Sequence, residues 1–150
     1  MKESIHNILQ EFDEKDAYEF PSNFDYDSLE SRAKAVQAGI ERELNESTVF
    51  EDGHYNQDAS FSIAIIFKER EKEERNAIYQ PSLRFSNFGS MTNIGWEEFF
   101  TKDELKRVKE ILTEHGFTYI PSSFLDQPYE GLMEGNLDFP NWRTRYFDWI

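Results

Sequence analysis

The sequence predicts an α+β fold: a single domain with a mainly antiparallel sheet of about four to six strands and about three helices packed largely on one face. Three observations predict this class. Residues 29–44 and 101–116 repeat apolar residues at helical spacing, and residues 59–67 alternate with the period of two that a strand shows. The segments after this strand are joined by turns, which favours antiparallel pairing. The length of 150 residues matches one ordinary domain.

Two helices are predicted before the sheet. The first carries one apolar stripe and stops before Phe20–Pro21, because proline interrupts helical hydrogen bonding. Asp27 with Glu30 three residues later resembles a capping box and predicts the start of the second helix. The two stripes are Ile5, Ile8, Leu9 and Phe12, then Leu29, Ala33, Val36, Ile40 and Leu44.

The strand at residues 59–67 has one strongly apolar face and one mildly polar face, which predicts an interior position. Asp52–Gly53 ahead of it predicts a short hairpin between Val49–Glu51 and His54–Tyr55. The fully charged run Lys68–Arg75 is interpreted as a solvated hairpin tip. After Pro81, which marks a strand start, an edge or a bulge, a tight turn is predicted at Asn87–Ser90.

A third helix is predicted from Thr101, which with Glu104 forms a capping box, to Gly116. Residues 117–120 follow as a strand that ends at Pro121, and residues 122–141 are predicted to be an ordered but irregular loop. The aromatic tail Trp142–Ile150 is predicted to be a final strand docked into the sheet, because a loose tail would expose a large apolar patch.

The amino-acid composition limits the cellular compartments that suit the protein and the kinds of binding site that it can form. The absence of cysteine excludes disulfides and thiolate metal sites and fits a reducing compartment. No apolar run is long enough for a signal peptide or a membrane span. We therefore expect a cytoplasmic protein that makes no membrane contact, and the oligomeric state stays open.

The charge of the chain is strongly negative and unevenly distributed. The 30 acids and 16 bases give a net charge of -14, and residues 1–30 hold nine of the acids and two of the bases. Such a field repels phosphate backbones, so no direct binding of nucleic acid is expected. The surplus of acids either keeps the domain soluble or forms a surface that meets a basic partner.

The sequence contains none of the familiar motifs for catalysis or cofactor binding. The three histidines are scattered, and no glycine-rich nucleotide loop or nucleophile elbow is present. The nearest approach to a metal cluster is Glu51, Asp52, His54 and Asp58, which a hairpin tip explains equally well. Adjacent carboxylates such as Glu97 and Glu98 are expected by chance among so many acids. No catalytic residue, metal site or cofactor is predicted.

Two groups of residues are the candidate sites. The polar residues Asn56, Gln57 and Asp58 precede the most apolar strand and form either turn hydrogen bonds or part of a pocket. Arg143 and Arg145 share one face of the predicted last strand beside aromatic residues, which is typical of an interface hot spot or of pairing with the surplus acids. The predicted partner contacts are Asp13, Asp16, Glu19, Arg143 and Arg145.

The function that these observations favour is a non-catalytic module that neutralises or sequesters a basic protein partner. Small acidic immunity proteins and inhibitors share the size, the acidity and the lack of cysteine, which is a likeness of composition and covers no particular residues. Two alternatives remain: a nucleic-acid mimic that blocks a DNA-binding protein, and a small enzyme or ligand-binding protein with a polar pocket near Gln57 and Asp58.

Overall fold

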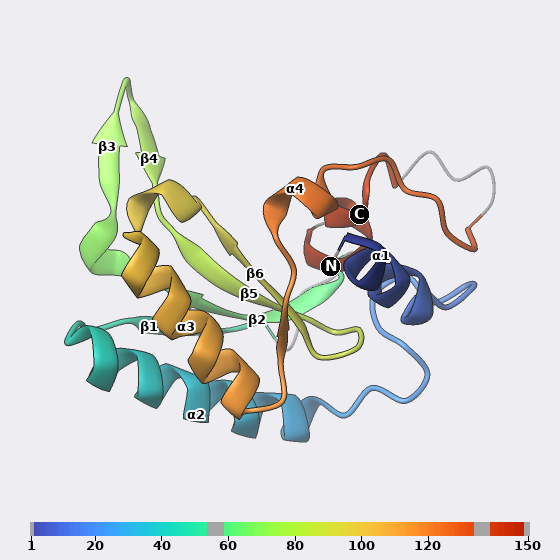
Figure 1. Cartoon of the computed structure of the whole chain (residues 1–150), viewed down its shortest axis with the longest axis horizontal. Helices are drawn as coiled ribbons and strands as arrows, with labels where there is room; N and C mark the ends of the chain where they lie inside the picture. The colour runs from blue at the N-terminus through green and yellow to red at the C-terminus, as the bar shows by residue number, and fades with distance from the viewer. Residues whose placement is uncertain (1, 54–58, 134–138, 149–150) are drawn as a thin grey trace.

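A five-stranded sheet lies at the centre of this computed structural model, which describes residues 2–53, 59–133 and 139–148 (Figure 1). The strands are β1 (Val49–Asp52), β2 (Phe61–Ile66), β5 (Ser82–Ser86), β6 (Met91–Gly95) and β7 (Thr118–Tyr119). They lie in the order β1-β2-β5-β6-β7, and every neighbouring pair is antiparallel except β6 and β7. The predicted α+β class with a mainly antiparallel sheet is confirmed.

Strand β2 is interior, as predicted from one strongly apolar and one only mildly polar face. All six of its residues are buried, and Ile63 and Ile65 point into the largest hydrophobic cluster. Strand β1 pairs directly with β2, with Asp52 opposite Ile63, and the N–H of Gly53 donates to the carbonyl of Ser62. The ladder partner of β1 is therefore β2, which corrects the predicted short hairpin. The predicted second flank, residues 54–55, lies outside the described residues.

Two long helices, α2 (Tyr26–Leu44) and α3 (Lys102–Glu114), run side by side across one face of the sheet (Figure 1). Helix α2 begins earlier than predicted, because Asp25 is the N-cap and accepts the N–H of Ser28 at 3.1 Å. The capping box at α3 is confirmed: Thr101 Oγ1 accepts from the Glu104 N–H at 3.1 Å, and the Glu104 carboxylate accepts from the Thr101 N–H at 2.8 Å. Both helices bury their apolar stripes against β2, β5 and β6.

The tail of the chain forms a helix, α5 (Trp142–Phe147), so the predicted final strand is wrong. The side chains of Trp142, Arg145 and Tyr146 are fully buried and recur at i, i+3 and i+4, which is a helical spacing. Asn141 is the N-cap and accepts the N–H of Thr144 at 3.0 Å. The last two residues of the predicted strand, 149 and 150, lie outside the described residues.

A second hydrophobic cluster joins α5 to α1 (Lys2–Glu11) and α4 (Ser122–Leu125) around the turn between β5 and β6. Its buried members are Leu9, Phe88, Met91, Ile120, Leu125, Trp142, Tyr146 and Phe147. The turn needs glycine at position 89, where φ is 60° and a Cβ atom would lie 2.2 Å from the ring of Phe12. No helix within the described ranges combines the length and the apolar composition required to cross a bilayer.

Strands β3 (Lys72–Glu74) and β4 (Ala77–Tyr79) form a separate two-stranded arm that projects from the sheet (Figure 1). Most of the run Lys68–Arg75 is exposed, which confirms the predicted solvated tip. Arg70 is the exception, because its guanidinium binds the carboxylates of Glu46 and Glu104, each at 2.6 Å. These ion pairs fasten the base of the arm to α3.

Candidate functional site

The connection between α1 and α2 concentrates the negative charge of the protein. We call residues 11–27 the acidic segment, because it holds seven acids and one base, Lys15. The acids are Glu11, Asp13, Glu14, Asp16, Glu19, Asp25 and Asp27. The segment leaves the cluster around α1 and α5, passes along the outside of the protein and reaches the start of α2 (Figure 1).

Arg145 of α5 holds the acidic segment in place from inside. Its Nε–H donates to Asp13 Oδ1 at 2.8 Å, and its Nη2 donates to the carbonyl oxygens of Ala17 and Glu14 at 2.7 and 3.2 Å. The two charged side chains are 0% and 1% exposed. The backbone of the segment is thus fixed in advance, and a fixed backbone loses less entropy when a partner binds.

The second carboxylate oxygen of Asp13 binds the opposite loop. It accepts the hydroxyl of Tyr129 at 2.6 Å and the N–H of Leu132 at 2.7 Å. Burial, with this hydrogen bond to Asp13, raises the pKa of Tyr129 to about 12, so the phenol stays a donor. Further along the segment, Asn87 donates its side-chain amide to the carbonyl of Glu19 at 2.8 Å.

Several acids outside the segment form ion pairs with arginines. Arg70 pairs with Glu46 and Glu104, Arg107 with Glu43, Glu110 and Glu114, and Arg143 with Asp126. Within the segment Asp13 alone forms an ion pair with a base of the described residues. Hydrogen bonds from Ser22 lower the pKa of Glu14, which keeps this carboxylate ionised. Apart from Asp13, the acids of the segment are therefore not paired with a base among the described residues.

Aromatic side chains stand between these acids. Phe12, Tyr18 and Phe20 are exposed, and Phe20 most of all, at 55%. Phe20 stacks on Phe24 with ring centroids 5.6 Å apart, and Tyr18 stacks on Phe139 at 5.8 Å. The rings are thus supported on one side. Exposed, supported aromatic rings are characteristic of binding hot spots.

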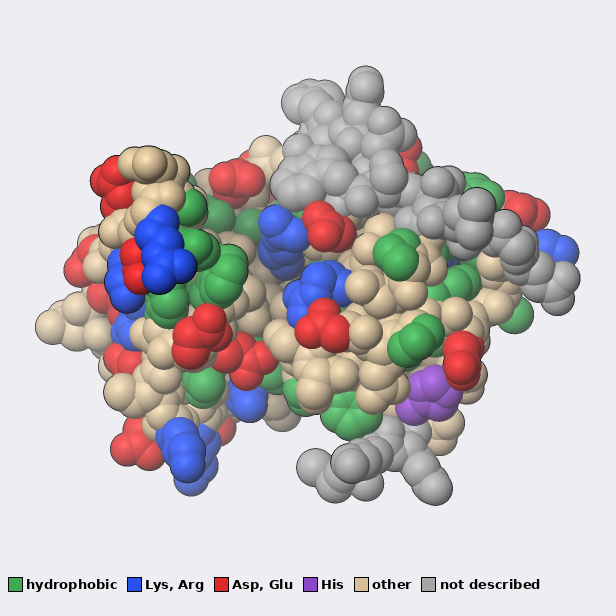
Figure 2. Space-filling view, turned by 90° about the horizontal axis from the view of Figure 1, so that it is seen from above, with side chains coloured by type: hydrophobic (Ala, Val, Ile, Leu, Met, Phe, Trp, Pro, Cys, Tyr) green, Lys and Arg blue, Asp and Glu red, His purple; other side chains and the backbone are tan. Residues whose placement is uncertain are grey.

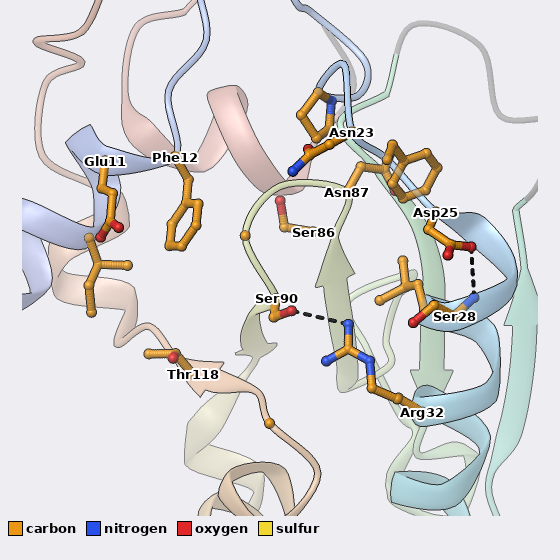
Figure 3. A pocket seen from close by; sticks show the side chains of 16 residues that line it. Glu11, Phe12, Asn23, Asp25, Ser28, Arg32, Ser86, Asn87, Ser90 and Thr118 are labelled. Carbon is orange, nitrogen blue, oxygen red and sulfur yellow. Dashed lines mark hydrogen bonds between the residues drawn. The ribbon is translucent and has the colours of Figure 1, made fainter.

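A pocket of about 600 Å³ lies beneath the segment, between the end of α1, the start of α2 and the turn after β5 (Figure 3). Glu11 and Phe12 stand on one side, and Asn23 and Asp25 stand on the other. Arg32 extends from α2 and donates to Ser90 Oγ at 3.1 Å. The volume is in the usual range for a small-molecule site.

The lining of this pocket offers polar contacts but no catalytic arrangement. Its sixteen lining residues contain no histidine, and none of their hydroxyl groups donates to a carboxylate. An activated nucleophile needs a base within hydrogen-bonding distance. Among these lining residues no such pair is formed.

The fold brings some of the predicted site residues together and separates others. Asp16 is exposed and Glu19 half-buried on the acidic segment. Asp13 and Arg145 were predicted as partner contacts, but both are buried and bound to each other. This pair agrees with the alternative interpretation, that the arginines pair with the surplus acids. Residues 56–58, the predicted polar pocket of Asn56, Gln57 and Asp58, lie outside the described residues.

Arg143 belongs to a second hollow, on the face of the sheet opposite α2 and α3. Its Nε–H binds Asp126 Oδ1 at 2.9 Å and its Nη1 donates to Asn93 Oδ1 at 3.1 Å. Figure 2 looks onto this face, where basic side chains lie next to acidic ones in the hollow. Sequence reasoning had selected Arg143 but none of the sheet residues beside it.

Comparison of the chain with protein families, with curated proteins and with solved structures gave no match. Among the described residues no three side chains of the metal-ligating types gather into a possible metal site. The acidic segment is therefore interpreted on its own geometry.

Proposed function

We propose that the protein is a non-catalytic binding module that neutralises or sequesters a basic protein partner, in the manner of an immunity protein or inhibitor. The observation that carries this proposal is the concentration of unpaired acids in one segment. The acids of residues 11–27 other than Asp13 form no ion pair with a base of the described residues, whereas several acids elsewhere pair with arginines. A fixed negative field accelerates association with a basic protein.

The exposed rings support a protein as the partner. Phe12, Tyr18 and Phe20 stand among the acids and offer apolar anchor area. In protein interfaces aromatic anchors supply most of the binding energy, and charges around them supply speed and specificity. A mimic of nucleic acid would instead need a regular double row of acids.

The test is capture of partners with the immobilised protein from an extract of its source cell, at low and then at high salt. We expect retained proteins to be basic and to be released as the salt concentration rises, because salt screens exposed charges. Each retained protein is then identified, purified and titrated against the acidic protein.

Two matched variants make the test specific. The first changes Glu11→Lys, Asp16→Asn and Glu19→Lys, and leaves the buried Asp13 intact. Asparagine is used at position 16 because φ there is 67°, which asparagine tolerates. The control variant changes Glu73→Lys, Glu74→Gln and Glu130→Lys, exposed acids outside the segment, and shifts the net charge equally.

The first variant should lose the partner while the control retains it. Both should keep the unfolding midpoint of the parent, since exposed charges contribute little to stability. Two results would contradict the proposal: capture of no basic protein, or an equal loss of affinity in both variants. Either would mean that the acids of the segment only keep the protein soluble.

A further inference from the structure

Trp96 combines a strained backbone with an exposed side chain. It follows β6 with φ 67° and ψ 52°, in the left-handed region that bulky residues avoid. Its side chain is nonetheless 46% exposed, so burial does not explain a tryptophan at this position. Residues held in such backbone conformations cluster at functional sites.

The ring of Trp96 is fixed and borders a groove. Tyr79 meets it edge-on with centroids 5.1 Å apart, and Phe99 lies behind it at 6.3 Å. The groove measures about 490 Å³ and lies on the face of the sheet shown in Figure 2. Trp96 and Gln80 form one wall, and α4 and α5 form the other.

The polar groups of the groove are held in fixed positions. Asn93 on the floor is buried, and its amide donates to the carbonyl of Ile120 at 2.8 Å and to Ser122 Oγ at 3.2 Å. Arg143 binds Asp126 on the opposite wall, and Arg84 donates to the carbonyl of Phe147 at 2.7 Å. The guanidinium of Arg143 and the carboxylate of Asp126 thus offer a donor and an acceptor in fixed positions, across the groove from the ring of Trp96.

The charge of the lining determines the class of ligand. Arg84 and Arg143 are balanced by Glu98 and Asp126, so the lining is neutral overall. The carboxylates oppose a phosphate, and the mostly polar surface offers little to an apolar molecule. A saccharide matches both features, because its C–H face packs on an aromatic ring and each hydroxyl both donates and accepts.

We propose that this groove is a carbohydrate-binding site, with Trp96 as the stacking platform, Arg143 and Asp126 as hydrogen-bonding groups, and Asn93 as the residue that positions Arg143. The groove is separate from the acidic segment. The proposal of carbohydrate binding is therefore tested independently of the proposed protein partner. Its ligand is a neutral mono- or oligosaccharide.

The probes are maltose, cellobiose, lactose and N,N′-diacetylchitobiose, with adenosine monophosphate as an anionic aromatic control. Binding is followed by tryptophan fluorescence and by the amide NMR signals of Gly95 and Asn93. We expect at least one disaccharide to shift these signals in a saturable way at millimolar concentration. Adenosine monophosphate should bind more weakly than that sugar.

Substitutions identify the groups that bind. Trp96→Asn removes the ring and tolerates the positive φ, and we expect a folded protein with affinity reduced about tenfold or more. Ile78→Ala on the exposed arm is the control and should bind normally. Arg143→Lys keeps the charge but loses the fork of donors, and it should also weaken binding.

Three results would overturn the proposal. These are the absence of a shift with all four disaccharides, tighter binding of adenosine monophosphate than of any sugar, and equal affinity in Trp96→Asn and Ile78→Ala. Loss of sugar binding in both Trp96→Asn and Arg143→Lys, with normal binding by the control, would establish the site.

Discussion

Asp13 and Arg145 form a buried ion pair, with Nε and Oδ1 2.8 Å apart, although 132 residues separate them along the chain. The pair links the acidic segment to the last helix. Arg145 also lies over the ring of Phe88 at 4.4 Å, in the turn between two sheet strands. One guanidinium thus connects the beginning, the middle and the end of the sequence.

Asp13→Asn should destabilise the protein by about 3–5 kcal/mol, because it leaves the buried charge of Arg145 without its partner. The free energy of unfolding in urea measures this effect. Asp16→Asn, an exposed acid of the same segment, is the control and should change stability by less than about 0.5 kcal/mol. Equal effects of the two substitutions would mean that the pair is not buried in solution.

Ile63→Ala should cost about 2–5 kcal/mol, because the side chain is fully buried between the sheet and its helices. Val49→Ala on the exposed edge strand β1 provides the comparison and should cost far less. Both values come from denaturant unfolding. A loss below about 1 kcal/mol at Ile63 would contradict the interior position of β2.

Stability should depend on pH through Glu104. The hydrogen bond from Arg70, with a further one from the Thr101 N–H, lowers the pKa of this carboxyl from 4.5 to about 2. A carboxyl with a depressed folded pKa contributes stability that is fully present above its unfolded pKa and is lost as the pH falls through the folded one. The contribution of Glu104 is therefore complete above about pH 4.5 and disappears towards pH 2.

Glu104→Gln tests this dependence, because glutamine retains the capping box and loses the charge. The difference in urea midpoint between the parent and this variant should shrink as the pH falls from 4.5 towards 2. Glu73→Gln on the exposed arm should show no such trend. A constant difference across this range would exclude a role for the Arg70 ion pair.

Local patterns predicted most of the fold. The β2 alternation, the α3 capping box and the turn at Gly89 each depend on neighbouring residues, so the sequence displayed them. The last helix was missed because its aromatic residues favour strands and because Arg143 and Arg145 were assigned to one face of a strand. Its burial depends on Asp13, and no local pattern reveals a partner so distant in sequence.

The candidate sites were less predictable than the fold. The excess of acids in residues 11–27 was visible in the sequence. Whether a base pairs with each of these acids depends on where the arginines and lysines lie in the folded chain. The groove beside Trp96 is formed by β5, β6, α4 and α5, so only the folded chain brings its residues together. Of its residues, the sequence had indicated only Arg143 as a candidate site residue. Arg143 was predicted to lie on a strand and not on a helix.

The acids and the rings of the acidic segment should affect different rate constants of partner binding. Phe20→Ala removes a large exposed anchor, so it should raise the dissociation rate and leave the association rate nearly constant. Glu11→Lys should lower the association rate and its dependence on salt, because exposed charges act on the approach of the partner. Surface plasmon resonance with the captured partner at several salt concentrations separates the two rates.

Ile78→Ala is the matched control for Phe20→Ala, since Ile78 is also a large exposed apolar residue and lies on the arm, outside the segment. It should alter neither rate constant. The double variant Phe20→Ala with Glu11→Lys should combine a slow association with a fast dissociation, because the two residues act at different stages of binding. If Phe20→Ala and Ile78→Ala behave alike, the rings are not anchors. A partner held by charge alone would then explain the salt dependence, and the acidic segment would act only by attraction.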